Sequence, residues 1–235
     1  MRHLETTGDL IRLHSECLAR GWGPRGIPVD IMGQISDNRY RMYFQSANPA
    51  SAQYKWLHAA VSILRPKLVI EFGRERGLSG LALWAALRHL PIYKLISVDT
   101  EIGGDYFANA MIDDRNFQRV LGSSLGRDCM RQVQRFRWKD PDIVFLDTTH
   151  DYAQVGGEIT TWQDTWYPGT LVIIDDIHLG DLGVLWGELP WPKLNISNDV
   201  HETGYGIAIF NGRQFRPRRR VLRQNSFERE YRGRF

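Results

Sequence analysis

Short continuous runs of apolar residues alternate with amphipathic stretches over most of the chain from Tyr54 onward. The apolar runs with the length of a buried strand are Leu68–Phe72, Lys94–Val98, Asp142–Leu146, Leu171–Ile174 and Gly206–Phe210. Helical periodicity is present at Tyr54–Leu64, Leu78–Leu90 and Tyr152–Trp166. Weaker signals indicate helices at Tyr106–Asp113 and Leu125–Phe136 and a strand at Phe117–Leu121. Apolar strands separated by helices are typical of βαβ units, whose parallel sheet is covered on both faces. The pattern therefore predicts an α/β fold with a doubly wound, mostly parallel sheet.

The two ends of the chain lack this alternation. Asp9–Arg20 suits a short amphipathic helix, whereas residues 21–51 are rich in Gly, Pro, Asn and Ser and are expected to form loops. We therefore divide the chain into an N-terminal helical and loop cap or lid (1–53), a sheet domain (54–212) and a C-terminal tail (213–235).

Composition narrows the class of protein. The 235 residues are 43% hydrophobic and 24% charged, as in an ordinary globular domain, and two cysteines are too few for a disulfide framework or a zinc site. No apolar run approaches the ~20 residues of a membrane span. The first residues also lack the apolar stretch of a signal peptide. The sequence therefore favours a cytoplasmic protein that does not associate with membranes.

The net charge of +3 is unevenly distributed along the chain. Residues 213–235 contain nine Arg and two Glu, whereas residues 1–212 contain 21 basic and 25 acidic residues. The tail is thus strongly basic and the body is mildly acidic. An argument for nucleic-acid binding applies to the tail and not to the body.

A glycine loop follows the first predicted strand. Gly73 and Gly77 have the spacing G-x-x-x-G, which allows the backbone to turn tightly and to approach a ligand. The second predicted strand ends at Asp99, where a carboxylate can accept two hydrogen bonds from a ribose diol. Together these features favour a nucleoside cofactor, and the alternative is a structural turn with a helix-capping Asp. Because the spacing is not G-x-G-x-x-G, the fingerprint of the dinucleotide-binding dehydrogenases is absent.

Acidic residues follow the fourth and fifth predicted strands. Asp147 comes directly after the fourth strand, and Asp175 and Asp176 come after the fifth. Neighbouring parallel strands would bring these carboxylates to one edge of the sheet, where their mutual repulsion requires a counter-charge. Mg²⁺ prefers oxygen ligands and keeps positions open for water or substrate, so the pattern favours a magnesium site. The alternative is that each Asp caps the helix that follows it.

Histidines near the same edge are candidates for a catalytic base. His150 lies three residues beyond Asp147 and has a titration range suited to taking a proton. His178 is the competing candidate, Asp151 would orient either ring, and His201 ranks third. On spacing alone, a catalytic and a structural role for His150 are equally open.

The glycine loop and the acid after the second strand resemble a known family. Val69–Gly73, Gly77 and Ser79, followed by Asp99, are similar to the first motif and the ribose-binding acid of class I S-adenosylmethionine-dependent methyltransferases.

The later motifs resemble one branch of that family. The run D-I-V-F-L-D-x-x-H-x-Y, which starts at Asp142, is similar to this branch, and so is the run Tyr167–Asp176. The branch includes the metal-dependent O-methyltransferases of macrolide sugars and the cephalosporin-hydroxylase-like proteins. The similarity extends over about residues 54–210.

The resemblance implies a role for each motif. Residues 54–212 would be the S-adenosylmethionine-binding catalytic domain, with a Rossmann-like sheet that ends in an antiparallel strand. His150 would be the general base, acting beside Asp147, and Mg²⁺ would be held by Asp147, Asp175 and Asp176. The implied cofactor-binding residues are Glu71, Gly73 and Ser79 at the methionine end, with Arg74 and Gly77 of the same loop, Asp99 at the ribose, and Gly122, Ser123 and Ser124 beside the adenine.

The function expected from this resemblance is Mg²⁺-assisted transfer of a methyl group from S-adenosylmethionine to a hydroxyl of a small molecule, such as a sugar or another natural product. Metal coordination would favour the alkoxide, and His150 would take the proton. Three alternatives stay open: an RNA methyltransferase that uses the Arg-rich tail, an N-methyltransferase of small molecules, and a cofactor-binding scaffold without turnover. The N-terminal segment and the tail are also candidates for contacts between copies of the chain.

Overall fold

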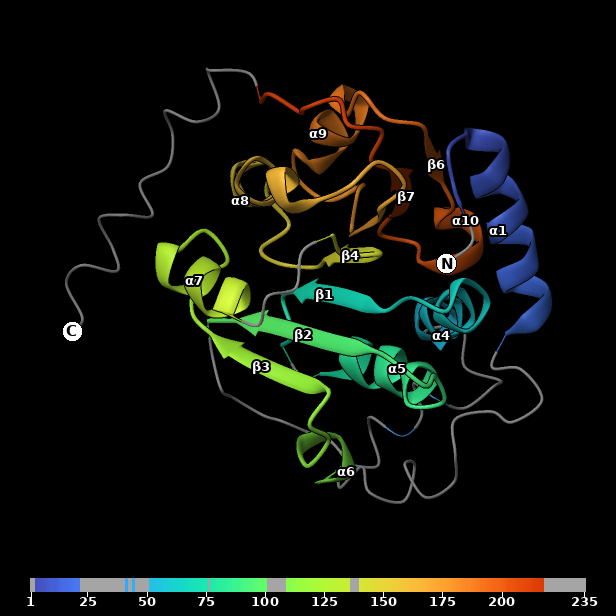
Figure 1. Cartoon of the computed structure of the whole chain (residues 1–235). Helices are drawn as coiled ribbons and strands as arrows, with labels where there is room; N and C mark the ends of the chain where they lie inside the picture. Colours follow the sequence, from blue (N-terminus) through green and yellow to red (C-terminus); the bar gives the residue numbers. More distant parts are fainter. Residues whose placement is uncertain are drawn as a thin grey trace.

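A computed structural model describes residues 3–21, 41, 44, 51–75, 77–100, 109–135 and 140–217. These residues form a seven-stranded sheet with the strand order β3-β2-β1-β4-β5-β7-β6 (Figure 1). The strands are β1 (Leu68–Phe72), β2 (Lys94–Asp99), β3 (Phe117–Leu121), β4 (Ile143–Leu146), β5 (Leu171–Asp175), β6 (Lys193–Asn195) and β7 (Tyr205–Ile209).

The strands have the directions expected of a Rossmann-like sheet that ends in an antiparallel strand. Strands β1 to β5 pair in parallel, β7 pairs antiparallel with β5, and β6 pairs antiparallel with β7. Strands β1 and β4 pair in parallel, so their carboxyl ends lie side by side, and the strand order reverses at this pair. In open α/β sheets, ligands bind at such a reversal. The predicted fold class and the closing antiparallel strand are confirmed.

Helices cover both faces of the sheet (Figure 1). Helices α1, α4 and α5 contribute to the hydrophobic core on one face, and α7, α8 and α9 contribute to the core on the other. None of the helices in the described part of the chain has both the length and the hydrophobicity needed to cross a membrane. The helices are α1 (Thr7–Arg20), α4 (Ala52–Leu64), α5 (Leu78–Leu87), α6 (Asn109–Ile112), α7 (Arg127–Arg135), α8 (Tyr152–Trp162), α9 (Leu182–Glu188) and α10 (Ser197–Val200), with a 3₁₀ turn η3 at Gln163–Thr165.

Three elements between β5 and β7 were not predicted from the pattern of apolar residues. These are α9, β6 and α10, which are seven, three and four residues long. Such short elements contain at most two helical turns or one alternation of a strand, so periodicity does not reveal them. The predicted helix over Tyr152–Trp166 is also shorter than expected, because it changes to the 3₁₀ turn after Trp162.

The N-terminal helix belongs to the main hydrophobic core. Thr6 and Asp9 form a reciprocal capping box at its start. Leu10, Leu13 and Cys17 are buried in the same core as α4 and α5. Most of residues 22–50 lies outside the described residues, so the lid over the site stays a prediction.

The beginning of the predicted tail packs on the body of the protein. Phe215 is 1% exposed, and its backbone N–H and carbonyl form two hydrogen bonds with the side-chain amide of Gln163, at 2.8 and 3.0 Å. The indole Nε1 of Trp191 donates to the carbonyl of Arg213 at 2.7 Å. Residues 218–235, which contain most of the arginines of the tail, lie outside the described residues.

Candidate active site at the carboxyl ends of the strands

Gly73 allows the end of β1 to lie directly against the end of β4. Its φ is +84°, and a Cβ at this position would lie 1.7 Å from the carbonyl oxygen of Asp147. The backbone N–H of Asp147 donates to the carbonyl of Phe72, and the N–H of Gly73 donates to that of Val98. The close approach that requires glycine here is thus to the backbone of Asp147, and it fixes the glycine loop next to the first acidic residue.

The carboxylate of Asp99 holds the glycine loop from the end of β2. Its Oδ2 accepts the backbone N–H groups of Arg74 at 2.6 Å and of Glu75 at 2.8 Å. Gly77 has a φ of +79° and is the N-cap of α5, so the loop turns directly into that helix. The structure therefore brings Gly73, Arg74, Gly77 and Asp99 together, as predicted for a cofactor loop, and gives Asp99 a supporting role besides its predicted ribose contact.

Glu71 lies beneath this loop and is completely buried. Its two carboxyl oxygens accept hydrogen bonds from the hydroxyls of Ser79 and Ser97, both at 2.5 Å. Burial raises the pKa of Glu71, and the two hydroxyls partly oppose this effect. The Glu71–Ser79 pair therefore joins β1 to the first turn of α5. A contact of Glu71 or Ser79 with the methionine end of a cofactor stays a prediction.

The third predicted cofactor segment lies between β3 and α7. The backbone N–H of Gly122 donates to the carbonyl of Asp99 at 2.8 Å, which places this loop beside the end of β2. Ser123 is exposed at the turn, whereas Ser124 is buried and points toward α8, where its hydroxyl donates to Glu158 at 2.5 Å. Ser123 is thus accessible to a ligand, and the hydroxyl of Ser124 is already used within the protein.

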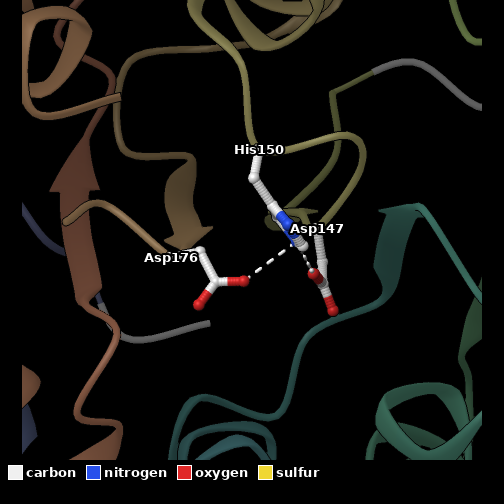
Figure 2. A group of neighbouring side chains, drawn as sticks. All are labelled: Asp147, His150 and Asp176. Atoms are coloured by element: carbon white, nitrogen blue, oxygen red, sulfur yellow. Dashed lines mark hydrogen bonds and ion pairs between the residues drawn. The ribbon is translucent and has the colours of Figure 1, made fainter. Parts of the chain in front are cut away.

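Three predicted residues meet beyond the ends of β4 and β5. Figure 2 shows the imidazole of His150 directed between the carboxylates of Asp147 and Asp176. The His150 Nε2 lies 3.4 Å from Asp147 Oδ1 and 2.9 Å from Asp176 Oδ2. The side chain of His150 is 40% exposed, whereas that of Asp176 is 10% exposed. The predicted convergence of Asp147 and Asp176 is therefore present, and the ring of His150 is open to solvent on one side.

A second group extends the cluster toward the turn before β7. The Nδ1 of His201 lies 3.2 Å from Asp175 Oδ1 and 3.5 Å from Asp176 Oδ1. The hydroxyl of Thr203 donates to Asp176 Oδ1 and lies 2.8 Å from the same His201 nitrogen. His201 ranked third from the sequence and Thr203 was not considered. Both residues lie in a turn almost thirty positions after Asp175, and only the antiparallel return of β7 beside β5 brings them to the site.

The electrostatics of the cluster depend on burial and on the two imidazoles. Burial raises the pKa of Asp147 and also that of Asp175. Burial also acts to raise the pKa of Asp176, but hydrogen bonds from His150 and Thr203 outweigh it, so this pKa is lowered. Hydrogen bonds to Asp147 and Asp176 raise the pKa of His150 to about 10. A hydrogen bond to Asp175 raises the pKa of His201. The imidazoles therefore act as counter-charges for the carboxylates.

Two residues of the cluster have a left-handed backbone. His150 has a φ of +51° and Asp176 a φ of +56°. His and Asp tolerate this region better than most residues, but it still costs of order 1 kcal/mol. Such strain is concentrated at functional sites, where it directs a side chain toward its task.

The other two candidates lie outside the cluster. The Nε2 of His178 contacts Asn195 at 3.0 Å and Ser197 at 3.5 Å, away from the carboxylates. Asp151 is the N-cap of α8, where its Oδ1 accepts the backbone N–H of Gln154 at 2.8 Å. Asp151 therefore has the structural role of a helix cap. His150, rather than His178, lies between the carboxylates of the cluster.

The donor atoms of the cluster fit a divalent cation. Asp147, His150 and Asp176 offer ligand atoms that all lie within 4.8 Å of one another, and so do Asp175, Asp176 and His201. The carboxylate oxygens suit Mg²⁺, and the added imidazole nitrogens also suit Mn²⁺ and other first-row metals.

A model of a known protein family matches the part of the chain that contains these residues. Residues 70–177 match the profile of a family described as a methyltransferase domain. That range begins in β1 and ends just after Asp176, so it includes the glycine loop and all three acidic residues. No curated protein sequence matches the chain.

Solved structures share the fold at low sequence identity. The SAH-bound methyltransferase PaMTH1 of Podospora anserina superimposes with a TM-score of 0.57 at 14% identity, covering 86% of this chain and 94% of that one. An O-methyltransferase of Bacillus cereus, in complex with SAH, gives 0.56 at 15% identity, covering 77% and 90%. The O-methyltransferase TomG of Streptomyces achromogenes, involved in tomaymycin synthesis and in complex with SAM, gives 0.56 at 18%, covering 77% and 89%. At these identities the likeness establishes the shared fold.

Proposed function

We propose that this chain is an S-adenosylmethionine-dependent methyltransferase, which transfers the methyl group of the cofactor to a hydroxyl of a small molecule with the help of a divalent cation such as Mg²⁺. The observation that carries the proposal is the convergence of three carboxylates and two imidazoles at the ends of β4 and β5. Two of the solved structures with this fold are O-methyltransferases, which supports oxygen as the acceptor atom.

The residues of the chain divide the task. The glycine loop after β1, held by Asp99, would bind the cofactor together with the exposed Ser123. The carboxylates of Asp147, Asp175 and Asp176 would hold the cation. Bound S-adenosylmethionine would supply the methyl group, and the cation would supply the positive charge that stabilises a substrate oxyanion.

His150 would accept the proton of the substrate hydroxyl. Its ring lies between Asp147 and Asp176 and is exposed enough for a substrate to reach it. Without a cation, His150 already holds a proton, because the two carboxylates stabilise its charged form. A cation held by the carboxylates would supply the positive charge that they otherwise receive from His150, which would free this imidazole to act as a base.

The test is a methyl-transfer assay on a panel of catechols, sugars and other hydroxylated small molecules, with S-adenosylhomocysteine release as the readout. We expect turnover with Mg²⁺ or Mn²⁺ and a loss of about 10²-fold or more in EDTA. Asp176→Asn should reproduce the loss, and His150→Gln should lower kcat by about 10²- to 10⁴-fold. Asp181→Asn is the matched control, since this carboxylate follows the same strand but accepts the backbone N–H of Tyr152 instead.

The alternative acceptors give different outcomes. Full activity of Asp176→Asn in EDTA would overturn the metal-assisted mechanism. Methyl transfer to RNA and not to any small hydroxyl would overturn the substrate class and favour the Arg-rich tail as an RNA-binding arm. Transfer to amines in preference to hydroxyls would assign the acceptor to nitrogen.

A further inference from the structure

Glu158 is a buried carboxyl on α8 that the proposed chemistry does not use. Its side chain is 0% exposed, and the described hydrogen-bond partners are two hydroxyls and one amide, all of them neutral. Burial raises the pKa of Glu158 to about 7. A buried carboxyl without a cationic partner adds little to stability compared with an apolar side chain of similar size. Its presence therefore calls for a role other than packing.

The partners of Glu158 come from two loops of the active site. Ser124, in the loop between β3 and α7, donates its hydroxyl to Glu158 Oε1 at 2.5 Å. Thr148, which directly follows Asp147, donates to Glu158 Oε2 at 3.1 Å. One carboxyl group thus joins the segment predicted to lie beside the adenine to the segment that carries the first acidic residue of the metal cluster.

Other residues of α8 reinforce the same connection. Gln154 and Trp162 lie one turn on either side of Glu158 on one face of the helix. The amide of Gln154 donates to both Ser124 Oγ and Glu158 Oε1, at 2.9 Å each, and the indole of Trp162 donates to the carbonyl of Ser124 at 2.7 Å. Ser124 is therefore held by three consecutive turns of the helix.

We propose that Glu158 is a positioning residue of the active site, which holds the Ser123–Ser124 loop and the Asp147–Thr148 segment at the separation that cofactor binding requires. The proposal rests on the proposed function, because only a cofactor that spans both segments would depend on their separation. Glu158 does not touch the reacting atoms and acts through Ser124 and Thr148.

The test compares two substitutions of Glu158 by the affinity for S-adenosylhomocysteine, measured by calorimetry. Glu158→Gln keeps the shape and one acceptor oxygen, and the hydroxyl of Thr148 can accept from the new amide, so we expect its Kd to stay within about threefold. Glu158→Leu removes both acceptors, so the hydroxyls of Ser124 and Thr148 lose the oxygens to which they donate, and we expect the Kd to rise by about tenfold or more. The KM for S-adenosylmethionine should rise by more than kcat falls.

Asp142 provides the matched control, because it directly precedes β4 and so lies at the end of the strand opposite to the site. Its buried carboxyl accepts the backbone N–H groups of Lys67 and Leu68 and the hydroxyl of Tyr167, at 2.6, 3.0 and 2.9 Å. Asp142→Leu should lower the melting temperature as Glu158→Leu does, but leave the Kd for S-adenosylhomocysteine unchanged. A Glu158→Leu protein that is destabilised but binds S-adenosylhomocysteine as tightly as the unmodified protein would overturn the proposal.

Thr148→Val tests the same connection in case Glu158→Leu does not fold. It removes one hydroxyl at a half-buried position, with almost no change of shape. We expect a rise in Kd of about threefold, the effect of one hydrogen bond, and an unchanged Kd would contradict the connection. Absence of S-adenosylhomocysteine binding by the unmodified protein would instead overturn the proposed function, and this inference with it.

Discussion

Tyr205 and Glu158 are polar residues that are completely buried near the carboxylate cluster, and each has a consequence for stability. Tyr205 on β7 pairs with Asp175 across the β5–β7 ladder and packs against Trp56 and Phe145. Its hydroxyl has no hydrogen-bond partner among the described residues. An unpaired buried hydroxyl costs about 1–3 kcal/mol, so its removal should do no harm to folding.

Tyr205→Phe is therefore expected to leave the free energy of unfolding unchanged or to raise it by about 1 kcal/mol. Denaturation in urea at pH 7 measures this difference. A decrease of more than about 1 kcal/mol would show that the hydroxyl has a partner in solution, such as a buried water molecule.

The buried carboxyl of Glu158 should make the stability depend on pH. Its pKa is raised by burial from 4.5 to about 7, so the folded state favours the protonated form. The corresponding stabilisation is fully present below pH 4.5 and is lost as the pH rises to about 7, by roughly 3 kcal/mol in total. Glu158→Gln has no proton to lose at this position. The difference in unfolding free energy between the unmodified protein and Glu158→Gln should therefore change by this amount between pH 4.5 and 8, and a constant difference would contradict the raised pKa.

At the scale of secondary-structure elements, the contact between the ends of β1 and β4 is the tightest backbone approach in the site. Gly73→Ala would place a Cβ against the carbonyl of Asp147 at a positive φ, so one of the two strand ends has to move. We expect a loss of more than about 3 kcal/mol of stability, together with weaker cofactor binding.

Gly187→Ala is the control for this prediction. Gly187 lies in α9, where a Cβ would meet no atom within 4 Å, and it has no positive φ. Ala should stabilise the helix at this position by about 0.5–1 kcal/mol. Equal melting temperatures for the two variants would contradict the steric argument at Gly73.

The longer strands and helices, and the residues that follow them, could be predicted from the sequence. Most of the parallel strands are continuous apolar runs, and the rule that ligands bind at their carboxyl ends directed attention to Asp147, Asp175 and Asp176. His150 was preferred to His178 only because of the family resemblance. His201 ranked only third and Thr203 was not considered, because both come from a short turn whose position depends on the antiparallel return of β7. Glu158 was missed because a single Glu within a helix is usually exposed, and only the packing of α8 against two loops buries it.

In the molecule as a whole, the segment that follows β7 packs against the hydrophobic core. Phe215 fills a position in the core beneath α8 and η3, and Gln163 pairs with its backbone. The basic segment that follows begins beyond this anchor. The predicted boundary of the tail at residue 213 therefore lies within a packed part of the protein.

Two truncations separate the anchor from the basic segment. A chain that ends after Gly212 loses Phe215 and should lose about 3–5 kcal/mol of stability, as when a buried Phe is truncated. A chain that ends after Pro217 should keep its melting temperature and its methyl transfer to small molecules. Loss of activity in the chain that ends after Pro217, together with loss of salt-sensitive RNA binding, would favour the RNA alternative.

We propose that the protein binds S-adenosylmethionine at the carboxyl ends of the strands, next to a divalent cation. Calorimetric titration of S-adenosylhomocysteine into the unmodified protein, with Mg²⁺ and again after EDTA, tests it most directly. We predict a micromolar Kd, about −8 kcal/mol, and a separate heat when Mg²⁺ or Mn²⁺ is titrated, which Asp176→Asn abolishes. Absence of S-adenosylhomocysteine binding under both conditions would show that the protein does not bind this cofactor.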